Sequence, residues 1–254
     1  MKTSIITVCY NAAGTLRDTI ESVLSQTYTD IEYIIVDGAS KDASVEMIKE
    51  YEPRFDGRLK WISEPDKGMY DAMNKGIRMA TGDLVGILNS DSFFSDKEVI
   101  TQIVKAFDYD PFLQAVYGDV RFVLPDDLKR TVRYYSSRIF SRRLFRFGFM
   151  PAHPSFYTFR KYYERFGLYK TDYRIAADFE LLTRFLYRHG LRTKYMPFDF
   201  VTMRTGGEST RSWKSHLLLN REIVRACREN GIYTNLPLLM LKYFYKITEL
   251  IRKD

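Results

Sequence analysis

Short apolar runs alternate with helical patterns through the first 110 residues of the chain. Four runs have the length and composition of buried strands: 4–9, 31–38, 59–63 and 84–88. Four other segments carry apolar residues at helical spacing: 16–26, the stretch around Val45 and Ile48, 69–82 and 99–107. Repeated strand-then-helix units predict an α/β fold with a mainly parallel sheet covered by helices on both faces.

Polar side chains follow each of the four predicted strands. In open α/β sheets, ligands bind beyond the carboxyl ends of the strands, so these residues are predicted to share one edge. Each is also typical of an ordinary turn. Taken together, they favour a site for a metal ion and a nucleotide. The residues are Tyr10 and Asn11, Asp37 and Gly38, Glu64 and Asp66, and Asn89 and Asp91.

The stretch VGILNSDSFF (85–94) places an amide, a hydroxyl and a carboxylate directly after an apolar run. Two interpretations are open: a turn, or oxygen ligands that converge on a hard cation. The chain contains neither G-x-G-x-x-G after the first strand nor G-x-x-x-x-G-K-[ST], which disfavours a nicotinamide dehydrogenase or a P-loop enzyme. A bound diphosphate is therefore expected to be neutralised by Mn²⁺ or Mg²⁺ on the strand-end oxygens.

Composition places the chain among globular proteins of one large or two small domains, with 254 residues, 45% hydrophobic and 28% charged. Cys9 and Cys227 are its two cysteines, which gives no disulfide framework and suits a reducing compartment. The N-terminus becomes polar too soon for a signal peptide, and no run is long enough for a membrane span. We therefore expect a cytoplasmic protein.

The net charge of +7 is concentrated in one part of the chain, because no Asp or Glu occurs between Leu128 and Tyr163. A solvated basic face, a nucleic-acid patch, a contact with anionic lipid and a cradle for a phosphorylated substrate all fit this pattern. The cations of the segment are Lys129, Arg130, Arg133, Arg138, Arg142, Arg143, Arg146, Arg160 and Lys161.

Three segments in series resemble the family 2 glycosyltransferases: TVCYNAAGTLRDTIESVLSQTY, IEYIIVDGASKD and SEPDKGMYDAMNKGIRMATGDLVGILNSD. HPSFYTF, RIAADFELLTRF and GGEST resemble the acceptor half of the same family, so the resemblance extends over about 3–210. It implies a Rossmann-like GT-A fold over 1–212, with a nucleotide-sugar-binding half (1–100) and an acceptor-binding half (101–212). A helical extension, 213–254, would follow.

The resemblance also implies site residues. Asn89-Ser90-Asp91 occupies the D-x-D position, in which Asp91 would hold a divalent metal, Mn²⁺ or Mg²⁺, with Asn89 as a neutral second ligand. The chain departs from the family in having Asn89 for the first Asp and Ser92 where an Asp often follows. The residues matched to nucleotide-sugar binding are Thr7, Tyr10, Asn11, Asp37, Asp66, Asp71, Asn89 and Ser90.

Asp178 falls where the family keeps its general base, although Ala177 precedes it where many members have Glu. An acceptor hydroxyl needs a carboxylate within about 3 Å to take its proton. The pattern RIAADFELLTRFL places Asp178 in the first turn of a helix, where a simple stabilising charge worth ~0.3–1 kcal/mol is the alternative. Leu181, Leu182 and Phe185 would pack inward.

Three further features are candidates for the site. His153 is either a loop or core residue, or a ligand of the metal or diphosphate. Arg204, with Gly206 and Gly207 of the GGEST loop, would contact the acceptor or the diphosphate, or else form an ordinary turn. The amphipathic stretch NLPLLMLKYFYKITELIRK (235–253) would dock on its own domain, on a partner or on a membrane.

The function expected from the resemblance is inverting transfer of a sugar from a nucleotide-sugar, UDP-linked, to a hydroxyl of a glycan or lipid-linked acceptor. Peripheral contact with the inner face of a membrane, through 129–161 or the C-terminal helix, would suit such an acceptor. A nucleotidyltransferase and a basic module binding RNA or anionic lipid are the alternatives, and no nucleic-acid partner is expected.

Overall fold

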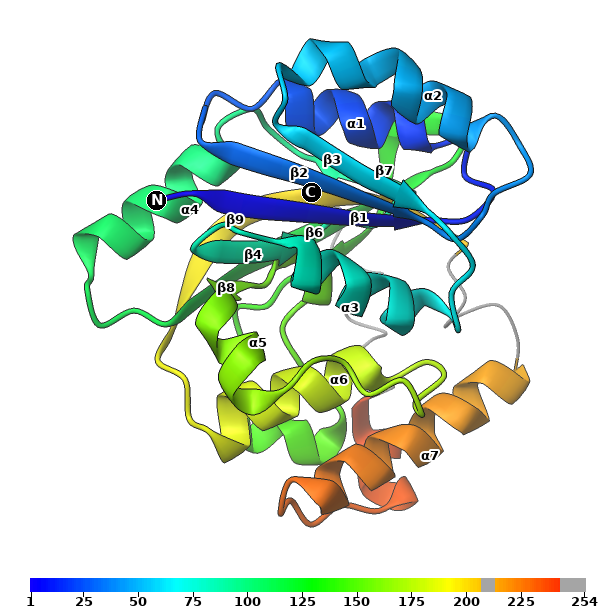
Figure 1. Ribbon diagram of the computed structural model, residues 1–254. Coiled ribbons are helices and arrows are strands. Elements are labelled where there is room, and N and C mark those ends of the chain that lie inside the picture. Colours follow the sequence, from blue (N-terminus) through cyan, green and yellow to red (C-terminus); the bar gives the residue numbers. More distant parts are fainter. Residues whose placement is uncertain (207–212, 243–254) are drawn as a thin grey trace.

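Alternate residues of β1 (Thr3–Cys9) face opposite sides of a central sheet. Ile5 and Cys9 belong to one hydrophobic cluster, whereas Ile6 and Val8 belong to another on the opposite face. A strand buried on both faces is expected at the centre of an α/β sheet, and it explains the unbroken apolar run. The computed structural model describes residues 1–206 and 213–242, and over these residues it contains a nine-stranded sheet (Figure 1).

The predicted strands of the first half form the parallel part of this sheet, in the order β3 (Leu59–Ser63), β2 (Ile31–Asp37), β1 and β4 (Leu84–Ile87). The register sets Cys9 of β1 opposite Asp37 of β2, and Asp37 opposite Ser63 of β3. The three strands therefore end at one level, which brings the loops that follow them to the same edge.

The other five strands make the sheet mixed, and the sequence patterns did not predict them. β8 (Tyr157–Phe159) is antiparallel to β4 and to β6 (Ala115–Leu124), while β9 (Thr193–Arg204) runs parallel to β6. β5 (Ser92–Phe94) pairs with the end of β9, and β7 (Asp127–Tyr135) forms a hairpin with β6. The pairing of β5 with β9 joins the stretch after residue 91 to the second half of the chain.

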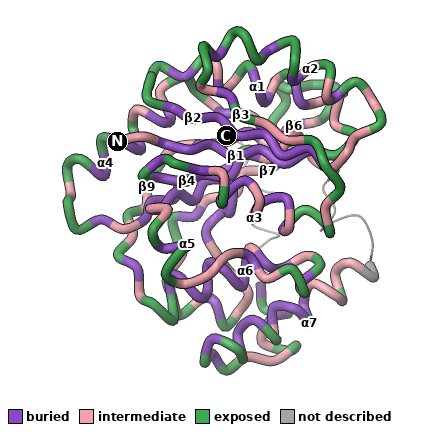
Figure 2. The backbone as a smooth tube through the Cα atoms, viewed as in Figure 1, coloured by how far each residue is buried: buried purple, intermediate pink, exposed green. Residues whose placement is uncertain are grey.

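Helices cover both faces of the sheet (Figures 1 and 2). α1 (Leu16–Leu24), α2 (Ser44–Tyr51) and α4 (Val99–Tyr109) cover one face. α3 (Met69–Met79) and α6 (Ala177–Leu182) cover the other, and a π-helical turn, η4 (Thr183–Arg188), extends α6. The remaining short helices are η1 (Glu52–Phe55), η2 (Arg142–Phe147), η3 (His153–Ser155) and α5 (Arg160–Phe166).

The C-terminal part of the described chain packs beneath α6. Ile223, Ala226 and Cys227 of α7 (Trp213–Glu229) join the same hydrophobic cluster as Phe179 and Leu182 of α6. A further helix begins at 236 and continues to 242, the last residue that the structure describes. Within the described part of the chain, no helix is both long enough and apolar enough to cross a membrane.

The basic segment 129–161 is divided among several elements. Arg142 of η2 donates hydrogen bonds to the carbonyls of Gly190 and Leu191, and Arg160 of α5 forms an ion pair with Glu164. Arg133 of β7 lies over the rings of Phe122 and Tyr135. These three cations therefore make local contacts on three different elements.

Candidate active site

The loops after β1, β2 and β3 meet at Gly38. A Cβ atom on Gly38 would lie 2.5 Å from Oδ2 of Asp66 and 3.5 Å from the ring of Tyr10. Only glycine therefore leaves room for the Asp66 carboxylate at this point. Tyr10 is 61% exposed, so its ring is free to contact a ligand, and Asp66 is half-buried. An exposed ring beside a carboxylate can stack on a flat base and accept hydrogen bonds from its edge.

Asp37 and Asn11 hold these loops together. The buried Asp37 carboxylate accepts hydrogen bonds from the hydroxyls of Ser40 and Ser63 and from the Ser40 N–H. Asn11, in a left-handed conformation with φ of 50°, accepts a bond from the Lys41 N–H, and its own N–H donates to Ser40. Asp37 and Asn11, which are both predicted to bind the donor, therefore hold this edge of the sheet in place through contacts with other residues of the protein.

Thr7 lies deeper than the other predicted donor-binding residues. Its side chain is buried in β1, where its hydroxyl accepts a hydrogen bond from the Tyr33 hydroxyl at 3.1 Å. Asp71 instead lies in the first turn of α3 and accepts a bond from the Lys67 N–H. It lines a pocket of about 310 Å³ between 67–71 and 171–174. The second of these segments ends four residues before Asp178 in the sequence.

The turn Asn89-Ser90-Asp91 is held from two sides. The hydroxyl of Thr19 on α1 donates to the carbonyls of Ser90 and Ser92, and the Ser92 hydroxyl donates to Oδ1 of Asp91 at 2.8 Å. Ser92, where the family often has an Asp, therefore orients the Asp91 carboxylate. The Ser92 N–H donates a hydrogen bond to the Asn89 carbonyl, so residues 89–92 form a turn. The same residues offer the oxygen atoms of the predicted cation site, so the two interpretations of this stretch do not exclude each other.

The oxygen atoms of this turn fit a divalent cation. Oδ1 of Asn89 is buried and has no hydrogen-bond partner in the described structure, a state that costs about 1–3 kcal/mol for a polar atom. With the Asp91 carboxylate, it offers the oxygen donors that Mg²⁺ and Mn²⁺ accept. Across residues 1–206 and 213–242, no three His, Cys, Asp or Glu side chains gather in a metal-binding cluster.

Arg204, the last residue of β9, contacts this turn. Its guanidinium donates to the Asp91 carbonyl at 3.1 Å, forms an ion pair with Asp18 of α1 and lies over the ring of Phe93. Gly206 follows with a φ of 109°, which is favourable for glycine, and open space around its Cα. Gly207, the other predicted residue of this loop, lies outside the described residues.

Asp178 lines a largely apolar pocket of about 230 Å³. As expected, the residue lies in the first turn of α6, and Leu181, Leu182 and Phe185 are buried. Asp178 is the one carboxylate among the described residues that line the pocket. The other polar residues of the lining are Arg133, Tyr135, His153, His216 and Lys242.

Burial raises the pKa of the Asp178 carboxyl from an ordinary value of 3.8 to about 6, and the charge of Glu222 on α7 adds to this rise. A hydrogen bond from the Phe179 N–H to the carboxylate opposes it. A carboxyl with such a pKa is mostly ionised at neutral pH and is still a stronger base than an exposed aspartate, which suits removal of a proton.

His153 lies at the wall of the same pocket, in η3. Its Nε2 is 2.6 Å from the Tyr169 hydroxyl, and burial lowers the pKa of the imidazole to about 4. The ring is therefore neutral at physiological pH. This contact within the protein is a hydrogen bond of the kind expected for a core histidine.

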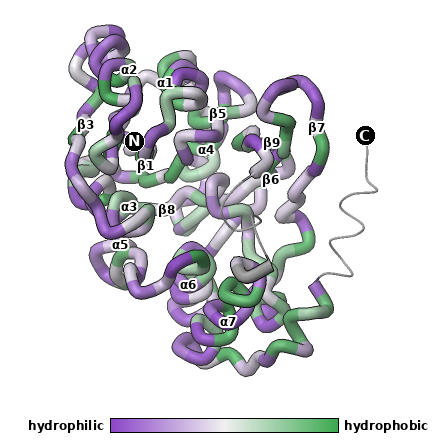
Figure 3. Tube along the Cα trace, turned by 90° about the vertical axis from the view of Figure 1, so that its right-hand side faces the viewer, coloured by the Kyte–Doolittle hydropathy of each residue, from purple (hydrophilic) through white to green (hydrophobic). Residues whose placement is uncertain are grey.

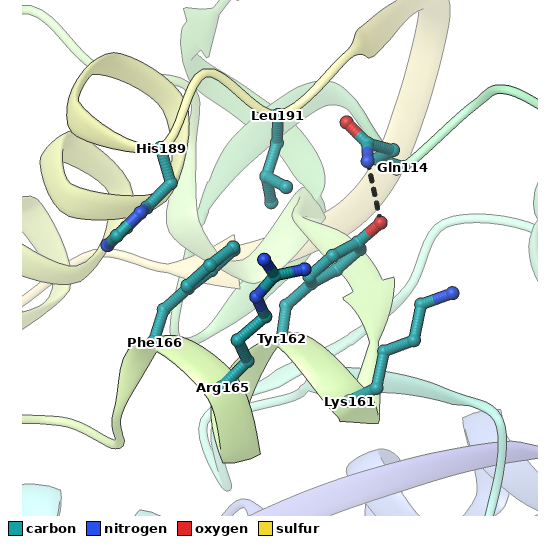
Figure 4. Close-up of a pocket in the computed structure, with 7 residues that line it drawn as sticks. All are labelled: Gln114, Lys161, Tyr162, Arg165, Phe166, His189 and Leu191. Carbon is teal, nitrogen blue, oxygen red and sulfur yellow. Dashed lines mark hydrogen bonds between the residues drawn. The ribbon is translucent and has the colours of Figure 1, made fainter.

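A third pocket, of about 400 Å³, is lined by none of the predicted site residues (Figure 4). Phe166 of α5 stacks on His189, with ring centroids 3.9 Å apart, and Gln114 donates to the Tyr162 hydroxyl. Lys161 and Arg165 also line it. The described residues of its lining include no carboxylate and none of the strand ends.

The sequence patterns missed two kinds of residue that shape the site. Ser40 and Ser63 fix Asp37, but serines in loops and at strand ends are too common to single out. Glu222 lies in a tail with no motif, and its role becomes visible only because α7 folds back against 174–176.

The chain matches the sequence profile of Glycosyl transferase family 2 over residues 4–169. An uncharacterized glycosyltransferase of Mycobacterium tuberculosis (strain ATCC 25618 / H37Rv) is 37% identical over 184 residues, which cover 71% of this chain and 67% of the relative. The chain therefore belongs to glycosyl transferase family 2, and the protein is a nucleotide-sugar-dependent glycosyltransferase. The predicted family and enzyme class are confirmed.

Two solved structures share the fold. S. aureus TarS 1–349 in complex with UDP-GlcNAc has a TM-score of 0.67 at 14% identity, over 92% of this chain and 68% of that one. The mannosyltransferase PcManGT from Pyrobaculum calidifontis, in complex with GDP-Man and Mn²⁺, has a TM-score of 0.64 at 18% identity, over 98% and 80%. These similarities confirm the predicted α/β, GT-A fold.

Proposed function

We propose that the protein transfers a sugar from a UDP-linked donor to a hydroxyl of a glycan or lipid-linked acceptor, with inversion at the anomeric carbon. The observation that carries this proposal is Asp178, a carboxylate with a raised pKa in a pocket of about 230 Å³. A single displacement needs one base and no enzyme nucleophile, which agrees with one carboxylate among the described residues of the lining.

In this proposal the donor lies across the ends of β1–β4. The base stacks on Tyr10 and bonds to Asp66, and Gly38 allows the two side chains to approach. Asn11 and Asp37 keep the loops in place. The family resemblance and the UDP-GlcNAc complex of TarS support a UDP-linked donor, whereas the GDP-Man complex of PcManGT makes a GDP-linked donor the alternative to test.

Asp91 and Asn89 would hold a divalent cation, which would supply the positive charge that a departing diphosphate needs. Ser92 orients the Asp91 carboxylate, and Arg204 fixes the Asp91 backbone. In the transfer itself, the acceptor oxygen bonds to the anomeric carbon while the bond to the diphosphate oxygen breaks. The proton of the acceptor hydroxyl passes to Asp178.

An acceptor linked to a lipid would be met at a membrane, and the helix that begins at 236 suits that contact. Leu236, Met240 and Leu241 are 41%, 42% and 51% exposed and share its outer side, and 232–241 carries no charged residue. Thr234 donates a hydrogen bond to the backbone carbonyl of Arg146, which joins this stretch to the basic segment 129–161. Figure 3 shows the hydrophobic colour of this stretch. Exposed apolar side chains together with a basic segment favour an anionic lipid surface.

The transfer is tested by incubating the purified protein with UDP-glucose, UDP-GlcNAc and GDP-mannose, with Mn²⁺ and a lipid extract as the source of acceptors. We expect one donor to release nucleoside diphosphate. Asp178→Asn and Asp91→Ala should each reduce this release to background. Wild-type release by either variant would remove that residue from the mechanism, and release of pyrophosphate would instead indicate nucleotidyl transfer.

A further inference from the structure

Glu222 of α7 forms an unusually complete set of hydrogen bonds with a distant part of the chain. Its carboxylate accepts bonds from three successive backbone N–H groups, those of Arg174 at 2.8 Å, Ile175 at 2.9 Å and Ala176 at 2.8 Å. The side chain is 8% exposed. A buried charge is costly unless it is well hydrogen-bonded, so this arrangement fixes both Glu222 and the 174–176 backbone.

The bound backbone leads directly into α6 and Asp178. Ile175 and Asp178 line the same pocket, only three residues apart. The carbonyl of Ile175 is held from the other side, because the Tyr70 hydroxyl of α3 donates to it at 2.5 Å. The segment that sets the direction of the Asp178 side chain is thus clamped between α3 and α7.

The electrostatics couple the same two carboxylates. Burial is the main cause of the raised pKa of Asp178, and the negative charge of Glu222 raises it further. Other groups face Asp178 from each side: Tyr70 and Tyr169, and the pocket residues Arg133, His153, His216 and Lys242. Glu222 differs from these groups because its carboxylate both accepts the hydrogen bonds of the 174–176 backbone and raises the pKa of Asp178.

We propose that Glu222 is a positioning residue for Asp178, holding the entry to α6 so that the carboxylate points into the pocket. This inference rests on the proposed role of Asp178 as general base. It assigns a part of the site to α7, beyond the region 4–169 that matches the family profile. A carboxylate that merely stabilised the fold would affect the melting temperature but leave the protonation of Asp178 and the balance of kcat and KM unchanged.

The direct test measures the protonation of Asp178 in the full chain by ¹³C NMR of labelled aspartate carboxyls, with the signal assigned through Asp178→Asn. This measurement needs no substrate. In Glu222→Gln, which has the same shape without the charge, we expect the Asp178 midpoint to fall by about half a pH unit or more. Glu222→Asp retains the charge and should keep a midpoint close to that of the wild type.

Kinetics provide the second readout, with the donor that is active in the panel above. Glu222→Ala should lower kcat by on the order of 10- to 100-fold, with KM for the donor within about twofold, because a misplaced base slows the chemical step. Glu222→Asp should restore part of kcat. Glu229→Gln is the matched control: it removes a carboxylate of the same helix that contacts the side chains of Lys170, Arg225 and Tyr173 and not the 174–176 backbone, and it should not shift the Asp178 midpoint.

An unchanged Asp178 midpoint in Glu222→Gln, together with a wild-type kcat in folded Glu222→Ala, would overturn the inference. Failure of the proposed function looks different. If Asp178→Asn retained full activity while Glu222→Gln still shifted the Asp178 midpoint, the placement of the carboxylate by Glu222 would stand and its role as base would be wrong.

Discussion

Arg204 at the end of β9 donates a hydrogen bond to the backbone carbonyl of Asp91, 3.1 Å away. The two residues are 113 positions apart and come from the acceptor and donor halves of the proposed catalytic domain. The same guanidinium forms an ion pair with Asp18 of α1. Arg204 of the acceptor half therefore holds two residues of the donor half, Asp91 and Asp18. This structural role comes in addition to its predicted contact with substrate.

Replacing Arg204 should loosen this turn. Arg204→Met keeps much of the side-chain volume but removes the bond to the Asp91 carbonyl, so we expect the free energy of unfolding to fall by about 1–3 kcal/mol. The stabilisation of the protein by UDP with Mn²⁺ should weaken as well, measured as the shift in Tm. Asp18→Asn is the control, because the Asp18 side chain is 43% exposed and its loss should cost at most about 1 kcal/mol. Equal effects of the two variants would contradict this account.

Asn89 should limit the affinity for the metal. Its buried Oδ1 has no hydrogen-bond partner in the described structure, and it brings no charge to a cation. Asn89→Asp adds a negative charge at this point, so the Mn²⁺ concentration that gives half-maximal stabilisation in the presence of UDP should fall. Asn89→Ala should raise that concentration. A titration in which both variants match the wild type would show that residue 89 does not contact the cation.

The activity should depend on pH through Asp178. The base must be ionised, and its pKa is raised to about 6, so kcat should fall below pH 6 and level off above about pH 7. The pH profile of nucleoside diphosphate release measures this. A profile with an acid limb near pH 4 would contradict a base with a raised pKa.

The raised pKa of Asp178 also predicts how the stability of the protein depends on pH. Ionisation of Asp178 supports activity but lowers the free energy of unfolding. Because the folded state holds the Asp178 proton more tightly than the unfolded chain, Asp178 contributes a cost that grows as the pH rises from about 4 through 6. Asp178→Asn should therefore raise the free energy of unfolding at pH 7.5 by up to about 3 kcal/mol. Below pH 4 the variant and the wild type should converge. Urea unfolding at both pH values tests this, and lower stability of the variant at pH 7.5 would contradict it.

The sheet has no room beside Gly86. A Cβ atom there would lie 2.0 Å from the ring of Tyr157, a buried residue of the neighbouring strand β8. Gly86→Ala should destabilise the protein by about 1–3 kcal/mol, because the ring cannot shift without disturbing the core. Gly14→Ala is the matched control, since no other group lies within 4 Å of its Cβ position. Chemical denaturation of both variants gives the comparison.

The sequence predicts the first half of the fold well because its signals are local. β1, β2, β3 and β4 are short apolar runs bounded by polar residues, and the parallel register then follows from the α/β arrangement. The second half depends on long-range pairing. β7 is largely exposed and rich in charge, and β5 has three residues, so neither has a recognisable pattern before it pairs with β6 or β9.

The residues of the site likewise divide into those that the sequence could predict and those that it could not. Tyr10, Asp66 and Asp91 are predicted as site residues because topology brings strand-end residues to one edge, and Asp178 is predicted through resemblance to a known family. The bonds from Glu222 to 174–176 span 46 to 48 residues and involve backbone N–H groups, which carry no signal in the sequence. The role of His153 stays a prediction, and its contact with Tyr169 came only from the structure.

The central claim is that the ends of β1–β4 bind the nucleotide and the cation together. A crystal structure of the protein with UDP and Mn²⁺ tests it most directly. We predict that the uracil lies against Tyr10 and Asp66, and that Mn²⁺ contacts the Asp91 carboxylate and the diphosphate. UDP bound away from these strand ends, or Mn²⁺ bound to the diphosphate without Asp91, would contradict the account.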